Sequence, residues 1–193
     1  MNQEIERKFA VKYIPKNLKI EKKIEITQDY IYHDKFTIVR VRKIKNEKNE
    51  IEYIYTVKTK GQIENSKNDI ANKYEIETNI KKEEYEKILK TKNKKISTIE
   101  KTRLVVKLEE NLRAEIDIYY NNLENLLTLE VEFPNEEKAK NFKKPDWFGE
   151  ELGYKKLSNG KLSKMTKKDF QKVVTKEFLE NNKKIINELK EKI

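Results

Sequence analysis

The sequence predicts a mainly β protein of the α+β class: an eight-stranded antiparallel barrel, closed around a polar tunnel, with peripheral helices and a C-terminal amphipathic helix. Three observations predict it. Over the first two thirds of the chain, β-branched and aromatic residues alternate with charged ones. Charges of like sign recur two residues apart within these runs, and after Pro134 the apolar period becomes helical. An ordinary small barrel has an apolar interior, so these charged rows favour a wet one.

The connections between the predicted strands are mostly short, as antiparallel hairpins require. The predicted strands are 2–12, 21–33, 36–46, 50–60, 72–79, 94–107, 111–120 and 126–133. Two connections differ from the rest. Between Lys82 and Thr91 the apolar residues have helical spacing, and the stretch from Gly61 to Ala71 is a polar loop.

Helix signals follow the last predicted strand. Asn135 can cap a short helix, and a second short helix is expected near Asp146, where Trp147 would pack it onto the barrel. Thr166 and Asp169 are spaced like a capping pair at the start of one long or two shorter amphipathic helices. We expect one domain over 1–193, with a tunnel core at 1–165 and a helical tail at 166–193 that covers the barrel or pairs with a partner.

Composition excludes several classes of protein. The chain has 193 residues and no cysteine, so it has neither disulfides nor thiolate metal sites. No segment resembles a signal peptide or a membrane span, which predicts a soluble cytoplasmic protein, monomeric or homodimeric. The net charge of +10 suggests nucleic-acid binding, but lysine is spread over the whole chain as on a solvated surface. Arginine is more informative, since it occurs only at Arg7, Arg40, Arg42, Arg103 and Arg113.

The first predicted strand carries a candidate site. Residues two apart in a strand share a face, so Glu4, Glu6 and Lys8 point the same way. Two carboxylates beside an ammonium suggest a divalent-cation site next to an anion site, because Mg²⁺ and Mn²⁺ take carboxylate oxygens and leave room for phosphates. In a chain so rich in Lys and Glu, this pattern alone would often arise on a solvated face.

The same alternation recurs in later strands, and this changes the interpretation. Charges share a face at Arg40 and Arg42, Lys58 and Lys60, Glu75 and Glu77, Lys101 and Arg103, Arg113, Glu115 and Asp117, and Glu130 and Glu132. Apolar residues are expected on the opposite face at Val39, Val41, Ile44, Ile54, Val57, Ile76, Ile116, Ile118, Leu129, Val131 and Phe133. Rows of charge that simply face solvent would leave these apolar rows unexplained. We therefore expect the charges to line the tunnel, where ligands and counter-charges satisfy them.

These residues carry a resemblance to a known family. Glu4-Ile5-Glu6-Arg7-Lys8-Phe9 resembles the Glu-x-Glu-x-Lys signature of the CYTH, or triphosphate tunnel metalloenzyme, superfamily. Later segments agree in order: Gln28-Asp29-Tyr30, Val39-Arg40-Val41-Arg42, Thr56-Val57-Lys58, Tyr74-Glu75-Ile76-Glu77, Glu100-Lys101-Thr102-Arg103, Glu115-Ile116-Asp117, Glu130-Val131-Glu132-Phe133 and Pro145-Asp146-Trp147-Phe148-Gly149. Singly these motifs are unspecific, but together they span about residues 1 to 164.

The resemblance implies a tunnel that holds a triphosphate and one or two Mg²⁺ or Mn²⁺ ions. Glu4, Glu6 and Glu132 would hold the first metal, with Glu130 and Asp117 close by. The expected phosphate contacts are Lys8, Arg40, Arg42, Lys58, Lys101 and Arg103. Lys60 and Arg113 are added from the alternation of charged residues alone. Lys156 is added because it stands where the family often has Arg-Tyr before Asn. Lys8 paired with Tyr30 would be the base or water-orienting group. Glu75, Glu77 and Glu115 complete the acidic lining.

The expected activity is metal-dependent hydrolysis of a triphosphate, most simply inorganic tripolyphosphate, because no segment offers an aromatic slot for a base. Thiamine or nucleoside triphosphatase, adenylate cyclase, and a non-enzymatic polyphosphate-binding module are the alternatives. The cyclase branch typically carries His-Phe before the signature, whereas this chain begins Met1-Asn2-Gln3. No Gly-rich phosphate loop is present, and His33 is interpreted as a solvated turn residue. Neither nucleic acid nor membrane is an expected partner.

Overall fold

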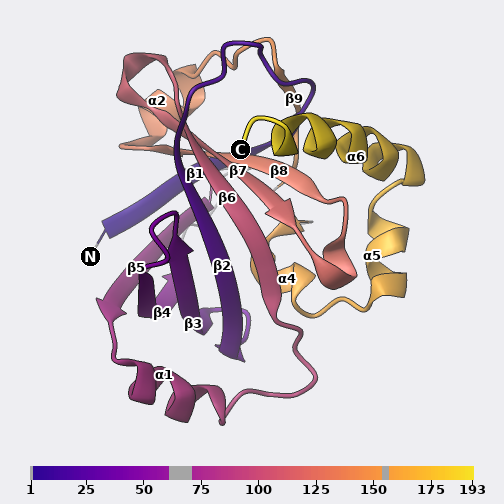
Figure 1. Ribbon diagram of the computed structural model, residues 1–193. Helices are drawn as coiled ribbons and strands as arrows, with labels where there is room; N and C mark the ends of the chain where they lie inside the picture. The colour runs from indigo at the N-terminus through magenta and orange to yellow at the C-terminus, as the bar shows by residue number, and fades with distance from the viewer. Residues whose placement is uncertain (1, 61–70, 154–156) are drawn as a thin grey trace.

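The computed structural model describes the backbone of residues 2–60, 71–153 and 157–193, and side chains within 5–59, 74–109, 111–153 and 157–193 (Figure 1). Its strands form one antiparallel sheet in the order β5-β4-β3-β2-β6-β7-β8-β1-β9. Their bounds are β1 Asn2–Val11, β2 Ile20–His33, β3 Thr37–Asn46, β4 Ile51–Lys60, β5 Ala71–Asn79, β6 Ile99–Lys107, β7 Arg113–Tyr119, β8 Leu127–Phe133 and β9 Phe148–Glu151. The mainly β content agrees with the prediction.

The predicted closed eight-stranded barrel is wrong, because the strands form a single nine-stranded sheet. β1 pairs with β8 along one edge and divides its other edge between two strands. Over Asn2–Glu6 that edge pairs with β5, whereas Phe9 and Val11 pair with β9 across an irregularity in the register. β5 therefore meets only the first half of β1, and β9 takes the rest of the edge.

β9 lies where the sequence predicted a helix near Asp146, so that prediction is also wrong. The strand has four residues, too few for a period of two to be recognised. Gly149 lets it approach β1 closely, since a Cβ at Gly149 would lie 2.9 Å from the Cβ of Ala10. Trp147 packs edge-on against Phe148, with ring centroids 4.5 Å apart, and does not begin a helix.

The helices lie around the sheet, with α1 at its lower end in Figure 1 and α4 to α6 on the right. Their bounds are α1 Lys82–Leu89, α2 Glu136–Asn141, α4 Asn159–Leu162, α5 Lys167–Val173 and α6 Lys176–Lys190. Asn135 caps α2, and Thr166 forms a capping box with Asp169 at α5. The tail is two helices because Val174 is extended and Thr175 caps α6. None of the described helices is long and apolar enough to cross a membrane.

Two apolar clusters hold the fold together. The larger contains Phe9, Leu129 and Phe148 and is covered by Ile185 and Leu189 of α6. The second contains Tyr30, Tyr119 and Phe170 and joins α4 and α5 to the sheet. Within the helical tail, α6 therefore covers the apolar side of the sheet, which was one of the two roles expected of the tail, whereas α5 packs near residues of the opposite side.

Strand pairing fixes which side chains share a face, because directly opposed residues project to the same side. We call the side that carries Lys8, Arg40 and Asp117 the polar face. Two residues expected on the opposite, apolar face lie on the polar face instead: Ile54 pairs with Arg42, and Ile44 is two residues along the strand from Arg42. Ile76 is on the apolar face but 58% exposed, since no described helix covers the sheet there. Strand β6 begins at Ile99, five residues later than predicted.

Candidate active site

The polar face brings charged side chains together from seven strands of the sheet. They are Glu6 and Lys8 of β1, Arg40 and Arg42 of β3, Lys58 of β4, Glu75 and Glu77 of β5, Lys101 and Arg103 of β6, Glu115 and Asp117 of β7, and Glu130 and Glu132 of β8. Their common face follows from the period of two. Most are buried, so their charges interact in a medium less polar than water.

One group of these charges centres on Asp117, which is fully buried. Its carboxylate accepts from Lys101 Nζ at 2.5 Å and from Arg103 Nε and Nη2, each at 2.7 Å. Arg103 also contacts Glu130 at 3.0 Å, and it is ion-paired with Glu115. The fork of Arg103 is therefore used on three carboxylates at once, a geometry that lysine lacks.

A second group lies on β3, β4 and β5. Arg40 Nη2 is 3.0 Å from Glu75 Oε1 and 3.6 Å from Glu77 Oε1, and Arg42 pairs with the same oxygen of Glu77. Lys58 Nζ lies 3.1 Å from Glu75 Oε2. Among the described side chains, three cations thus share these two carboxylates, an excess of one positive charge within the group.

Lys8 and Tyr30 are fully buried between these groups. Lys8 Nζ donates to the carbonyl oxygen of Leu157 at 2.9 Å and lies 2.8 Å from Glu130 Oε1. The Tyr30 hydroxyl accepts from Gln28 Nε2 at 2.8 Å. Gln28 belongs to a motif quoted from the sequence, but it was not predicted as a site residue, because a lone amide gives no charge pattern.

The two buried lysines have opposite pKa shifts. Burial lowers the pKa of Lys101 to about 8, helped by the neighbouring Arg103 charge and opposed by Asp117. For Lys8, burial also lowers the pKa, but the carboxylates of Glu130, Glu6 and Asp117 outweigh it and raise the pKa. Burial raises the pKa of Tyr30 to about 12 against the opposing Arg40 charge. Of these three groups, Lys101 is the one that exchanges a proton most readily near neutral pH.

Two of the predicted metal ligands are engaged by cations. Burial raises the pKa of Asp117, but Arg103 and Lys101 outweigh it and lower it. Burial likewise raises the pKa of Glu130, yet Lys8, Lys101 and Arg103 hold it well below its usual range. Both carboxylates are therefore ionised and neutralised within the protein. We expect the main role of these two carboxylates to be to hold Lys8, Lys101 and Arg103 in position.

Glu6 and Glu132 are the described carboxylates best placed for a metal. They oppose each other directly across β1 and β8, with Glu6 buried and Glu132 exposed. Carboxylate oxygens suit Mg²⁺ or Mn²⁺. Within the described side chains no three acidic or histidine groups lie close enough together to hold an ion. The donor chemistry fits a hard cation, and a third ligand is expected from Glu4, whose side chain lies outside the described residues.

Other predicted residues lie elsewhere. Arg113 lies on the expected face of its strand but contacts neither the charges around Asp117 nor those on β3, β4 and β5. Its side chain is 61% exposed, and its Nε lies 2.8 Å from Glu21 Oε2. The pattern of alternation could not show that Arg113 stands at the end of its strand. The side chain of Lys60 and the whole of Lys156 lie outside the described residues.

The segment around α4 covers the polar face near Tyr30. Besides the contact of Lys8 with Leu157, the Tyr119 hydroxyl donates to Asn159 Oδ1 at 2.7 Å. The imidazole of His33 stacks on Tyr30 with centroids 5.6 Å apart, and a Cβ added to Gly160 would lie 2.5 Å from His33 Cε1. The prediction of a solvated turn residue at His33 is therefore wrong, because the ring is packed between β2 and α4.

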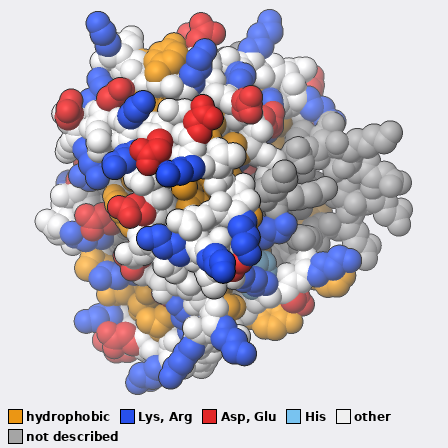
Figure 2. All heavy atoms as spheres, turned by 90° about the vertical axis from the view of Figure 1, so that its right-hand side faces the viewer, with side chains coloured by type: hydrophobic (Ala, Val, Ile, Leu, Met, Phe, Trp, Pro, Cys, Tyr) orange, Lys and Arg blue, Asp and Glu red, His pale blue; other side chains and the backbone are white. Residues whose placement is uncertain are grey.

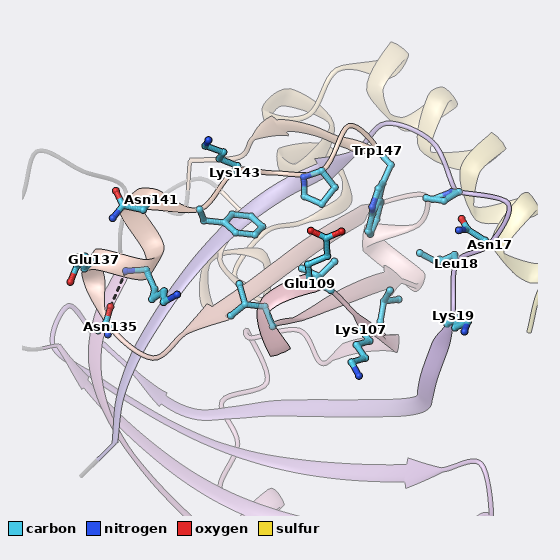
Figure 3. A pocket seen from close by; sticks show the side chains of 17 residues that line it. Asn17, Leu18, Lys19, Lys107, Glu109, Asn135, Glu137, Asn141, Lys143 and Trp147 are labelled. Atoms are coloured by element: carbon cyan, nitrogen blue, oxygen red, sulfur yellow. Dashed lines mark hydrogen bonds between the residues drawn. The ribbon is translucent and has the colours of Figure 1, made fainter.

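The outer surface offers less definite chemistry. Figure 2 shows lysine, arginine and acidic side chains interspersed over the face that includes α5 and α6, without a continuous basic patch on its coloured part. A groove of about 1070 Å³ lies between α2 and the turn that joins β6 to β7, lined by Trp147, Glu109 and Lys107 among others (Figure 3). Its lining contains none of the charged residues gathered on the polar face.

Comparisons with known proteins agree with the sequence motifs. No protein-family model matches the chain. An inorganic triphosphatase of Nitrosomonas europaea is 43% identical over 54 residues, which cover 28% of this chain and 36% of that protein. The structure of the inorganic triphosphatase NE1496 matches with a TM-score of 0.54 and 29% identity, over 86% of this chain and 97% of NE1496.

A second structure of NE1496, described as a hypothetical protein, also has a TM-score of 0.54 and covers 84% of this chain and 99% of that one. PH1819 from Pyrococcus horikoshii, 20% identical with a TM-score of 0.52 over 71% of this chain and 82% of its own, shares the fold. The ordered motifs, the polar face and these likenesses agree with the resemblance of this chain to the CYTH, or triphosphate tunnel metalloenzyme, superfamily.

Proposed function

We propose that the protein is a divalent-metal-dependent triphosphatase that cleaves the terminal phosphoanhydride of inorganic tripolyphosphate to give pyrophosphate and phosphate. The observation that carries the proposal is the buried group formed by Arg40, Arg42 and Lys58, in which three cations share two carboxylates. An excess of fixed positive charge in a buried site favours a polyanion. The similarity to inorganic triphosphatases supports the same substrate.

Buried donor groups support the phosphate assignment. Among the described atoms, the Nε group of Arg42 is buried and has no hydrogen-bond partner. A buried donor without a partner is costly, and a phosphate oxygen would satisfy it. Arg40, Arg42 and Lys58 are proposed to hold one part of the triphosphate, and Arg103 and Lys8 another. When the substrate binds, these cations would give up their contacts with Glu75 and Glu77 and contact phosphate oxygens instead.

Hydrolysis requires a bond from a water oxygen to the terminal phosphorus while the bridging P–O bond breaks and its electrons leave with pyrophosphate. The water must also lose a proton. We assign its uptake to Lys101, which is buried on the polar face beside Asp117 and Arg103 and whose pKa is lowered to about 8 by burial. Lys8, whose pKa is raised, stays charged and is assigned to phosphate contact. Tyr30 orients the substrate through its hydroxyl.

Glu6 and Glu132, with Glu4, are proposed to hold Mg²⁺ or Mn²⁺. A bound divalent cation would neutralise charge on the phosphates and polarise the bond that breaks. The carboxylates of this set would otherwise repel a polyanion. Which metal is preferred is tested together with the substrate.

Phosphate release from tripolyphosphate, ATP, thiamine triphosphate and pyrophosphate, each with Mg²⁺, Mn²⁺ or excess chelator, tests the proposal. We expect tripolyphosphate to be the best substrate, pyrophosphate to be poor and chelator to stop turnover. Faster hydrolysis of ATP or thiamine triphosphate would assign one of those activities instead. Formation of cyclic AMP would indicate a cyclase, and tight tripolyphosphate binding without turnover a binding module.

A further inference from the structure

Arg7 lies between Glu6 and Lys8 in the sequence, but its side chain is on the opposite face of the sheet. The guanidinium makes a two-pronged contact with Glu151 of β9, with Nε 2.8 Å from Oε1 and Nη2 2.6 Å from Oε2. Nη1 donates to the carbonyl oxygen of Ala139 at 2.9 Å and reaches that of Phe142 at 3.4 Å. One side chain therefore ties β1 to both β9 and the end of α2.

Backbone pairing is sparse at this edge. In register, β9 pairs with β1 only at Phe9 and Val11, with an irregularity between them. Two more backbone bonds flank this ladder, from Leu152 N to the carbonyl oxygen of Lys8 at 2.8 Å and from Lys12 N to that of Trp147 at 2.9 Å. The contact between Arg7 and Glu151 continues the connection beyond this short ladder, toward the residues that face the site.

The contact also explains why arginine stands at this position. Lysine occupies most basic positions of the chain, and the sequence holds only five arginines. A lysine could replace one of these hydrogen bonds but not the fork, and it would lose the stacking of the guanidinium over Phe9, 5.1 Å from the ring centroid. Arg7 is the one arginine that points away from both the polar face and open solvent: its side chain is 18% exposed.

We propose that Arg7 is a positioning residue, which fixes β1 from the apolar face so that Glu6 and Lys8 keep their places in the site. The inference rests on the proposed function. Lys8 Nζ is held at 2.8 Å from Glu130 and 2.9 Å from the Leu157 oxygen, distances that a small rotation of β1 would change. Glu6 and Lys8 flank Arg7, so such a rotation displaces both together. Misplacement of reacting groups by about 1 Å can cost on the order of a hundredfold in rate.

The test compares Arg7→Met, Arg7→Lys, Glu151→Gln and the double variant Arg7→Met/Glu151→Gln with wild type. Arg113→Met is the matched control, because it removes an exposed arginine–glutamate pair from the same sheet. Steady-state kinetics with tripolyphosphate at saturating metal and hydrogen exchange of the β1 amides are measured on each. Temperatures stay well below each variant's unfolding midpoint.

We expect Arg7→Met to lower kcat about tenfold with little change in KM, and to speed amide exchange over 5–9 severalfold. Arg7→Lys should not restore kcat, and the double variant should be no worse than Arg7→Met, because both changes remove one contact. Arg113→Met should leave kcat and β1 exchange unchanged.

Wild-type kcat and exchange in Arg7→Met would overturn the inference, as would full rescue by lysine. An equal loss in Arg113→Met would show a general effect of stability and overturn it too. If wild type fails to hydrolyse tripolyphosphate, the proposed function is wrong, and β1 exchange alone decides the role of Arg7. Unchanged exchange would then refute it.

Discussion

Replacing Arg42 by lysine tests the phosphate assignment while keeping the charge. Arg42 is largely buried, is paired with Glu77, and has an Nε group without a partner among the described atoms. Burial, with a further contribution from Arg40, lowers its pKa to about 10, so the guanidinium stays charged at neutral pH. We expect Arg42→Lys to fold and to hydrolyse tripolyphosphate more slowly.

The magnitude follows from the hydrogen bond that lysine cannot make. Lysine can replace the bond to Glu77 but cannot at the same time offer the Nε donor to a phosphate oxygen. One charge-assisted hydrogen bond contributes about 2 kcal/mol, which is roughly a thirtyfold loss in rate if the contact strengthens in the transition state. If the contact serves ground-state binding alone, KM rises by a similar factor and kcat is kept.

The assay is steady-state phosphate release by Arg42→Lys, with circular dichroism to confirm folding. Arg113→Lys is the control, since its exposed ion pair with Glu21 contributes at most about 1 kcal/mol to stability and lies outside the site. We expect the control to match wild type within about twofold. Equal kinetics for Arg42→Lys and the control would mean that Arg42 does not contact the substrate, and the cationic group would no longer support a triphosphate site.

Three further outcomes are expected. Glu6→Gln should raise the Mg²⁺ concentration needed for half-maximal activity and weaken Mn²⁺ binding measured directly by calorimetry; unchanged Mn²⁺ affinity would remove Glu6 from the ligand set. For Lys101, whose pKa is about 8 and therefore below the ordinary value, the neutral form gains population as pH rises, so kcat/KM should increase toward pH 8 and level above it. A profile that falls over this range would assign Lys101 to phosphate contact as a cation. Gly160→Ala should destabilise the protein by about 1–3 kcal/mol in urea unfolding, and His33→Ala should relieve most of that loss; no relief would mean that the tight contact lies elsewhere.

The sequence predicted the common face of the charged residues because the period of a strand needs only local information. Arg40, Thr56 and Glu77 lie side by side on neighbouring strands, as their alternation requires. Alternation does not reveal where a strand ends, and Arg113 was misplaced for that reason. It also cannot reveal pairing partners: nothing local shows that Glu75 faces Lys58.

The errors of the fold prediction have similar causes. A four-residue strand such as β9 carries no clear period, and its presence depends on β1 accepting it along half of one edge. His33 was misjudged because its position beside a turn is local, whereas the contact with Gly160 joins segments far apart in sequence. Arg7 was overlooked for the same reason, as its partners lie on β9 and α2. Gln28 was overlooked because a lone amide gives no charge pattern.

The shared edges of β1 have a consequence for how the chain acquires its structure. β1 is the first strand in sequence, yet its partners are β5, β8 and β9, the last of which ends at Glu151. During synthesis β2, β3 and β4 can pair as successive hairpins, while β1 must wait for β5 and, more than a hundred residues after its own end, for β8 and β9. Until then the edges of β1 and β8 are open to pairing with other chains. Glu6 and Lys8 therefore take their final places in the site late. If synthesis stopped before β8, the basic residues of β3 and β4 would be in place, but Glu130 and Glu132, which lie opposite β1, would be missing.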